Sequence, residues 1–73
     1  MTEGRGAKIV SAIKDGKKNF SRADLSGIEI FDANLEGSEL VGADLSHSDL
    51  THCNLRGADL TKAKLMNSRL WNA

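Results

Sequence analysis

Residues 23–72 read ADLSG IEIFD ANLEG SELVG ADLSH SDLTH CNLRG ADLTK AKLMN SRLWN, one five-residue pattern repeated ten times without interruption. The third residue of each five is a leucine or, once, an isoleucine: Leu25, Ile30, Leu35, Leu40, Leu45, Leu50, Leu55, Leu60, Leu65 and Leu70. Short repeats at a fixed period are typical of solenoids, in which each repeat packs only against its neighbours.

A period of five fits neither a helix nor a flat strand. Every fifth residue of an α-helix lies about 140° further round the axis, so the leucines would not share a face. In a strand, a step of five changes face each time. The pattern is satisfied if the chain turns a corner once per repeat, with the first and third residues inward, the second outward and the last two at the corner. Successive turns would then stack about 4.8 Å apart.

The residue types at each position agree with this assignment. The first positions are mostly Ala or Ser, because an interior that already holds a leucine has little room; Ile28 and Cys53 are the exceptions. The second positions are mostly Asp, Glu or Asn, which suits an outward side chain. The fifth positions favour Gly, Asn, Asp and His, which tolerate a left-handed backbone, whereas Lys62 does not fit that preference.

The A-[D/N]-L-x-x pattern over residues 23–72 resembles the pentapeptide-repeat family. The resemblance implies an all-β solenoid, a right-handed, four-sided (quadrilateral) parallel β-helix with four repeats per coil. Ten repeats would make about two and a half coils, and we assign residues 17–73 to this domain. Phe20 lies five residues before Leu25 and extends the pattern backwards, although Lys18 is a poor inward residue.

The segment before the repeats is expected to form a cap. Residues 1–6 contain two glycines and are predicted to be disordered. Residues 7–16 place Ile9, Val10 and Ile13 at helical spacing and end at Gly16, which predicts a short α-helix. So short a helix is unstable alone. We expect it to cover the open end of the first coil and to block stacking by another chain.

The C-terminal end of the repeats has no equivalent cap in the sequence. Three interpretations stay open: a two-fold dimer formed end to end, a piece of a longer solenoid, or closure of the end by Trp71 itself. We favour the dimer, because each leucine left exposed forgoes roughly 2 kcal/mol of burial. The predicted self-association residues are Leu60, Leu65, Met66, Leu70 and Trp71.

Charge is zoned along a chain whose formal net charge is zero. Residues 23–55 contain seven acidic and no basic residues, and both flanking segments are mainly basic. The acidic residues are either a solvated surface or a docking band for a basic protein, formed by Asp24, Glu29, Glu39, Asp44 and Asp49.

Composition and spacing argue against several kinds of site. The neutral charge gives no indication of direct nucleic-acid or membrane binding, and the absence of an apolar run or signal sequence favours a cytoplasmic location. His47, His52 and Cys53 are close in sequence, but a coil places the histidines at successive corners and the cysteine inward. We therefore predict no metal site, no catalytic residues, no cofactor and no small-molecule substrate.

The sequence thus predicts a non-catalytic scaffold or protein–protein interaction module, which we expect to self-associate. The family resemblance implies an alternative, since some pentapeptide-repeat proteins protect bacterial DNA gyrase from quinolones by mimicking DNA. Those proteins resemble longer, strongly acidic rods, whereas this chain has 73 residues and no net charge.

Overall fold

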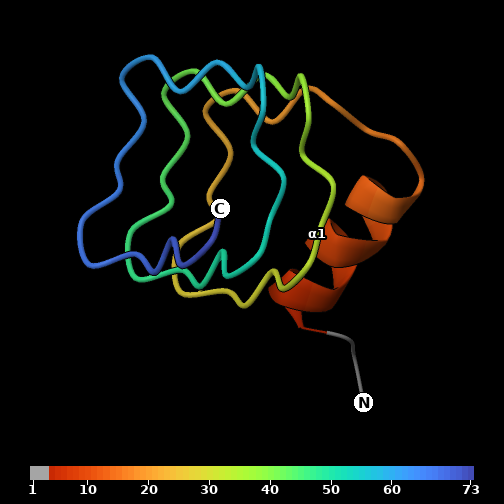
Figure 1. Cartoon of the computed structure of the whole chain (residues 1–73), viewed down its shortest axis with the longest axis horizontal. Helices are drawn as coiled ribbons and strands as arrows, with labels where there is room; N and C mark the ends of the chain where they lie inside the picture. The colour runs from red at the N-terminus through yellow and green to blue at the C-terminus, as the bar shows by residue number, and fades with distance from the viewer. Residues whose placement is uncertain (1–3) are drawn as a thin grey trace.

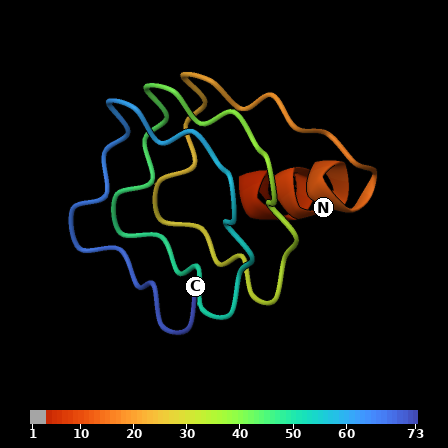
Figure 2. The same cartoon turned by 45° about the horizontal axis from the view of Figure 1, so that its top comes forward.

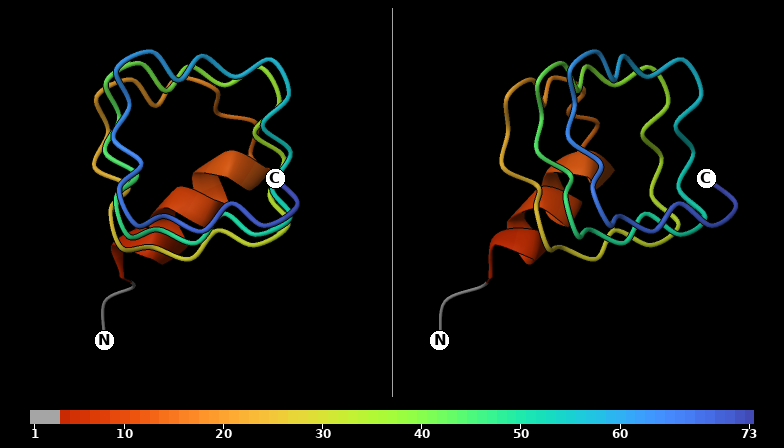
Figure 3. Two further views of the ribbon diagram at one scale, coloured as in Figure 1. Left: turned by 60° about the vertical axis from the view of Figure 1, so that its left-hand side comes forward. Right: turned by 90° about the vertical axis from the view of Figure 1, so that its left-hand side faces the viewer.

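A computed structural model describes residues 4–73 and shows one helix, α1 (Arg5–Lys14), followed by a winding chain (Figure 1). The windings are joined by isolated parallel bridges between residues twenty apart: Asn19–Glu39, Asp24–Asp44, Glu29–Asp49, Asn34–Asn54, Glu39–Asp59, Asp44–Lys64 and Asp49–Arg69. A turn every five residues and a bridge every twenty give four corners per coil, and Figure 3 shows the squared outline. The twenty-residue step implied by the family resemblance is therefore observed. A continuous sheet is not, because each pairing within residues 4–73 is a single-residue bridge.

Backbone hydrogen bonds repeat identically from coil to coil. The third residue donates to the next coil (Leu25 N to Asp44 O, 2.8 Å), and so does the fifth (Gly27 N to Ser46 O, 2.9 Å). The second residue donates to the coil before (Asp44 N to Ala23 O, 3.0 Å). Each repeat thus makes three bonds along the coil axis, and these satisfy backbone groups that burial would otherwise leave unpaired.

The leucines fill the interior as the pattern predicts. Leu35, Leu40, Leu45 and Leu50 are at most 1% exposed, and Ala43 between them is fully buried. Ile28, the bulky residue at a small position, lies in the first coil beside Gly6 of α1. The corners also follow the prediction: φ is positive at every fifth position, including Lys62 at 59°.

Helix α1 lies across the start of the first coil (Figure 2). Ile13 is buried in the core, and Ile9, Val10 and Ala12 pack against it. Arg5 forms an ion pair with the Asp24 carboxylate (2.7 Å) and donates to the carbonyls of Asp24 and Ser26. The helix begins at Arg5, two residues before the predicted 7–16, because these contacts hold its first turn. Arg5 and Gly6 therefore do not belong to a disordered segment, and residues 1–3 lie outside the described residues.

The coil begins one repeat earlier than the ten quoted repeats. Asn19 bridges to Glu39, Phe20 is 4% exposed and Arg22 has a φ of 62°, so residues 18–22 form a further repeat. The Lys18 side chain avoids the interior and donates to the Glu36 carbonyl at 2.9 Å. We name residues 18–37 the first coil, residues 38–57 the second and residues 58–73 the last.

Ser38 supplies a stability prediction. Its hydroxyl is buried without a hydrogen-bond partner, whereas the hydroxyl of Ser48, also at a first position, donates to the Leu45 carbonyl at 2.6 Å. We expect Ser38→Ala to raise the free energy of unfolding by about 1 kcal/mol, because alanine removes the unpaired group. The matched change Ser48→Ala should be neutral or destabilising. Urea denaturation compares the two, and a destabilised Ser38→Ala variant would contradict this account of the site.

Candidate interaction surface at the C-terminal end of the coil

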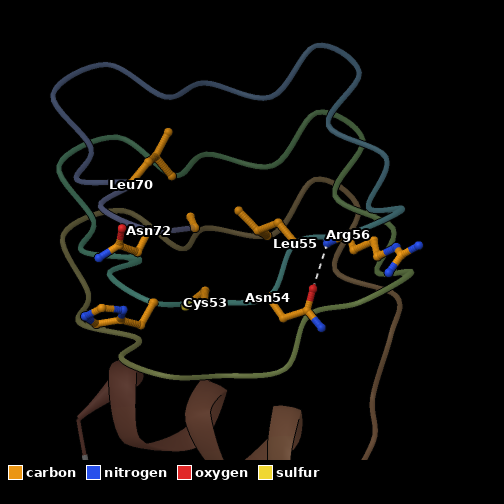
Figure 4. A pocket seen from close by; sticks show the side chains of 8 residues that line it. Cys53, Asn54, Leu55, Arg56, Leu70 and Asn72 are labelled. Atoms are coloured by element: carbon orange, nitrogen blue, oxygen red, sulfur yellow. Dashed lines mark hydrogen bonds between the residues drawn. The ribbon is translucent and has the colours of Figure 1, made fainter.

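The last coil leaves the interior uncovered at its C-terminal end. Ile30, Leu50 and Leu70 occupy equivalent positions in successive coils, and their exposed fractions are 0%, 0% and 41%. A hollow opens beside Leu70 and is lined by His52, Cys53, Asn54, Leu55, Arg56, Leu70, Asn72 and Ala73. Figure 4 shows Leu55 and Leu70 extending toward this hollow, while Arg56 points away from it. The same apolar layer that is sealed in the middle of the solenoid is open here.

The backbone at this end is also unpaired. Within residues 4–73, the N–H groups that would donate to a following coil have no backbone acceptor; they belong to Leu55, Gly57, Leu60, Lys62, Leu65, Asn67, Leu70 and Asn72. The carbonyls of Cys53, Ala58, Ala63 and Ser68 likewise lack the donor that earlier coils receive. We call these groups the C-terminal edge. An exposed edge of this kind is a template for pairing with another chain.

The predicted self-association residues fall into two groups. Leu60 and Leu65 are half-buried in the open layer with Leu70. Met66 and Trp71 lie at corners and are 70% and 73% exposed, so they form the outer margin of the end. Trp71 lines a shallow outer groove with Thr51 and Arg69 and does not cover the interior. The interpretation in which Trp71 closes the end by itself is therefore wrong.

Sequence reasoning missed the contribution of Asn54, Leu55 and Arg56 to this end. They belong to the second coil, yet they line the hollow because the last coil does not pass over them. The twenty-residue step was the signal that could have placed them, since a residue is covered by the one twenty positions later.

The predicted acidic docking band is spread around the coil. Asp24 and Asp44 share one side, Glu29 and Asp49 the next, and Glu39 lies on a third. Bridges place Asp44 beside Lys64 and Asp49 beside Arg69. Neither pair forms an ion pair within 4.0 Å; among residues 4–73 the only such contact joins Arg5 and Asp24.

The aspartates instead bind the backbone of their own corner. Asp44 accepts from the Ser46 N–H at 3.0 Å, and Asp49 accepts from the Thr51 N–H at 3.1 Å. Asn34 and Asn54 use their amide oxygens in the same way, toward Glu36 and Arg56. These turns fix the corner and leave the side chains little freedom to reach a neighbouring coil.

The same hydrogen bonds shift the acidity of the aspartates. Hydrogen bonds from Ser46 lower the pKa of Asp44, and Lys64 adds to the effect. Hydrogen bonds from the residue two positions on also lower the pKa of Asp24, Asp49 and Asp59. A lowered pKa means that the ionised form stabilises the folded state, so this stability is present above the ordinary value of 3.8 and is lost as the pH falls below it.

We therefore expect acid unfolding to begin as the pH falls below about 4. The triple variant Asp44→Asn, Asp49→Asn, Asp59→Asn should keep the corner hydrogen bonds, as Asn34 and Asn54 do, and lose part of this pH dependence. Thermal unfolding between pH 7 and pH 2.5 measures both. If the triple variant and the parent lose stability equally over this range, these carboxylates do not carry the effect.

The residues considered for metal binding and catalysis do not converge. His47 and His52 lie at successive corners with φ near 60° and are exposed. Cys53 is 1% exposed, its thiol faces the Ile30 carbonyl, and burial raises the pKa of the thiol. Within residues 4–73 there is no group of three or more metal-ligating side chains, and no helix has the length and apolar character needed to span a bilayer.

A protein-family model for pentapeptide repeats matches eight copies over residues 19–55 and 28–67. No curated protein matches the chain. Together the two matched ranges run from Asn19, the first bridge residue, to residue 67 and cover most of the coiled part, and the five-residue period of the family is that of the observed corners. The chain therefore belongs to the pentapeptide-repeat family.

Proposed function

We propose that the protein is a non-catalytic, cytoplasmic scaffold that binds other proteins and self-associates as a homodimer through its C-terminal end. The observation that carries the proposal is the 41% exposure of Leu70, whose equivalents Ile30 and Leu50 are fully buried. Covering the 41% of Leu70 that is exposed would recover about 1 kcal/mol, and covering the half-buried Leu60 and Leu65 would add less for each. We also propose that the coil has the right-handed, four-sided β-helix fold that is typical of the family.

The remaining surface supports binding by shape and charge more readily than catalysis. Second-position side chains stand outward along the coil and are mainly Asp, Asn or Glu. A ring of ionised aspartates held by their own corners is a rigid surface, and rigid charged surfaces lose little entropy on binding. The acidic docking band stays part of this proposal, with a basic protein surface as the partner.

Solution mass tests the self-association. We expect the mass of the full chain to rise from one copy to two or more with concentration, as measured by light scattering on a sizing column. Trp71→Asp should require about tenfold higher concentration, because a charge at the margin of the end costs about 1.4 kcal/mol of association. His47→Asp is the control, since it adds the same charge at an exposed corner of the second coil. Asp32, at a corner of the first coil, shows that aspartate tolerates the positive φ of such a position. A single-copy mass at all concentrations, or equal effects of the two changes, would contradict the proposal.

Regulation of DNA gyrase by DNA mimicry is a second candidate from the family. Its support is limited to the aspartates on the first two coils, which carry negative charge at neutral pH as ordinary aspartates do. A supercoiling assay with purified gyrase tests it; absence of inhibition or quinolone protection at micromolar protein would exclude it.

In the interpretation of the chain as a piece of a longer solenoid, the next coil of that solenoid would cover the C-terminal edge.

Changing Asp24, Glu29, Asp44 and Asp49 to Asn tests whether a partner binds through the acidic docking band. Loss of a specific partner in a pull-down would support docking through the acidic band, and an unchanged set of partners would count against it.

A further inference from the structure

The two ends of the solenoid carry opposite hydrogen-bonding groups. The C-terminal edge presents eight unpaired N–H groups and four carbonyls. In each repeat the N–H groups of the third and fifth residues donate to the next coil, and only the carbonyl of the first residue accepts a hydrogen bond from it. The first coil presents the reverse. Eight carbonyls and four N–H groups there lack backbone partners within residues 4–73: the carbonyls of Asn19, Ser21, Asp24, Ser26, Glu29, Phe31, Asn34 and Glu36, and the N–H groups of Asn19, Asp24, Glu29 and Asn34. We call this set the N-terminal edge.

This inventory argues against the two-fold dimer expected from the sequence. Two C-terminal edges facing each other would bring together two sets of eight donors and only two sets of four acceptors. Half of the donors would lack a carbonyl. A C-terminal edge and an N-terminal edge match in number, eight donors to eight carbonyls and four carbonyls to four donors, and their contact is of the kind each coil already makes with the next.

The outward side chains also favour contact between a C-terminal edge and an N-terminal edge, when the second copy is turned in one particular way about the coil axis. The outward residues of the C-terminal edge are Asn54, Asp59, Lys64 and Arg69, and those of the N-terminal edge are Asn19, Asp24, Glu29 and Asn34. If Asp24 of a second copy sits over Lys64, then Asn19 sits over Asp59 and Glu29 over Arg69. Asn34 then lies two coil spacings from Asn54, because the coil rises one spacing per turn, so three of the four sides pair. Two acidic–basic pairs form and no two like charges meet. Asp44–Lys64 and Asp49–Arg69 are the corresponding bridges found within the chain.

Helix α1 occupies the N-terminal edge in the structure. Among its side chains, Arg5 makes the polar contacts to this edge: it donates to the carbonyls of Asp24 and Ser26 and forms an ion pair with the Asp24 carboxylate. Lys18, which follows the helix, donates to the Glu36 carbonyl. The ion pair is exposed on both sides, so it holds the helix weakly. Ile13 provides the apolar cover that Leu65 and Leu70 of another copy could provide instead.

We propose that the C-terminal edge of one copy binds the N-terminal edge of a second copy, head to tail, in the rotation that sets Asp24 over Lys64, when α1 of the second copy is displaced. This inference deepens the proposed self-association and rests on it. Helix α1 is then a removable cover that controls assembly, and each bound copy offers a new C-terminal edge.

Disulfide trapping in the full chain tests the rotation. In a Cys53→Ser background, Glu29→Cys with Arg69→Cys places thiols that meet only between copies. Within one chain they are two coil spacings apart, about 9.6 Å, which is beyond disulfide reach. We expect oxidation to give a ladder of dimers and larger species that a reductant collapses. The matched pair Glu29→Cys with Lys64→Cys lies one side away and should give no ladder. Equal cross-linking of both pairs, or dimers from Arg69→Cys alone as in a two-fold contact, would overturn the proposal.

Loosening α1 tests the cover. Arg5→Ser removes the ion pair and both carbonyl contacts, and we expect it to lower the protein concentration needed for association about tenfold. A two-fold contact would not respond, because α1 lies at the other end. If Trp71→Asp weakens association while Arg5→Ser has no effect and no ladder forms, self-association stands and the head-to-tail arrangement is wrong.

Discussion

Replacing Leu45 by alanine is expected to lower the free energy of unfolding by about 2–5 kcal/mol, the largest effect that we predict for a single change. Leu45 is fully buried in the second coil, between layers above and below that cannot collapse into the space it leaves. Domains of this size are stable by about 5–15 kcal/mol, so the variant is close to unfolding at 37 °C. Chemical denaturation monitored by the far-ultraviolet circular dichroism of the coil measures the change.

Leu65→Ala is the matched control, because it removes the same atoms at the equivalent position of the last coil. Leu65 is only half-buried, so its loss should cost less than half as much. Equal costs at the two positions would contradict the open end. An unaffected Leu45→Ala variant would contradict the inward assignment of the third residue.

Replacing Ala43 by leucine is expected to destabilise the fold by about 1–3 kcal/mol through overpacking. Ala43 is fully buried beside Leu40 and Leu45, and its N–H is bonded to the Leu40 carbonyl at 3.1 Å, so the backbone cannot move away from a larger side chain. The melting temperature should fall by several degrees.

Ala63→Leu provides the comparison for overpacking. Ala63 is equivalent to Ala43 in the last coil but is only partly buried, so an added isobutyl group can extend toward the open end. We expect a smaller loss there, or a gain where the leucine covers exposed apolar surface. A greater loss at Ala63 than at Ala43 would show that the last coil is not open.

The five-residue period was sufficient to predict which way each side chain points. It predicted the buried leucines and a corner at every fifth position, because both follow from turning one corner per repeat. The positive φ at Lys62 shows that the position in the repeat outweighs the preference of the residue type. It did not contain the number of corners in a coil. A period of five is compatible with several polygons, and the value of four came from the family resemblance before the bridges confirmed it.

The differences from prediction arise where tertiary contacts outweigh local preference. Two glycines indicated a disordered start, but Arg5 reaches the carbonyls of Asp24 and Ser26 and extends α1. Asp44 and Asp49 lie beside Lys64 and Arg69, but their carboxylates are held by the N–H groups of Ser46 and Thr51. The donor excess of the C-terminal edge was not visible in the side-chain pattern, because it belongs to the backbone.

Residue-resolved amide hydrogen exchange is the most direct test of a twenty-residue coil with an open, self-associating end. The account predicts slow exchange at Leu25, Leu45 and Leu50, whose N–H groups are bonded to the next coil, at every protein concentration. It predicts fast exchange at Leu60, Leu65 and Leu70 in dilute protein, and protection of these three at high concentration. Protection of the three in dilute protein, or fast exchange at all concentrations, would contradict it.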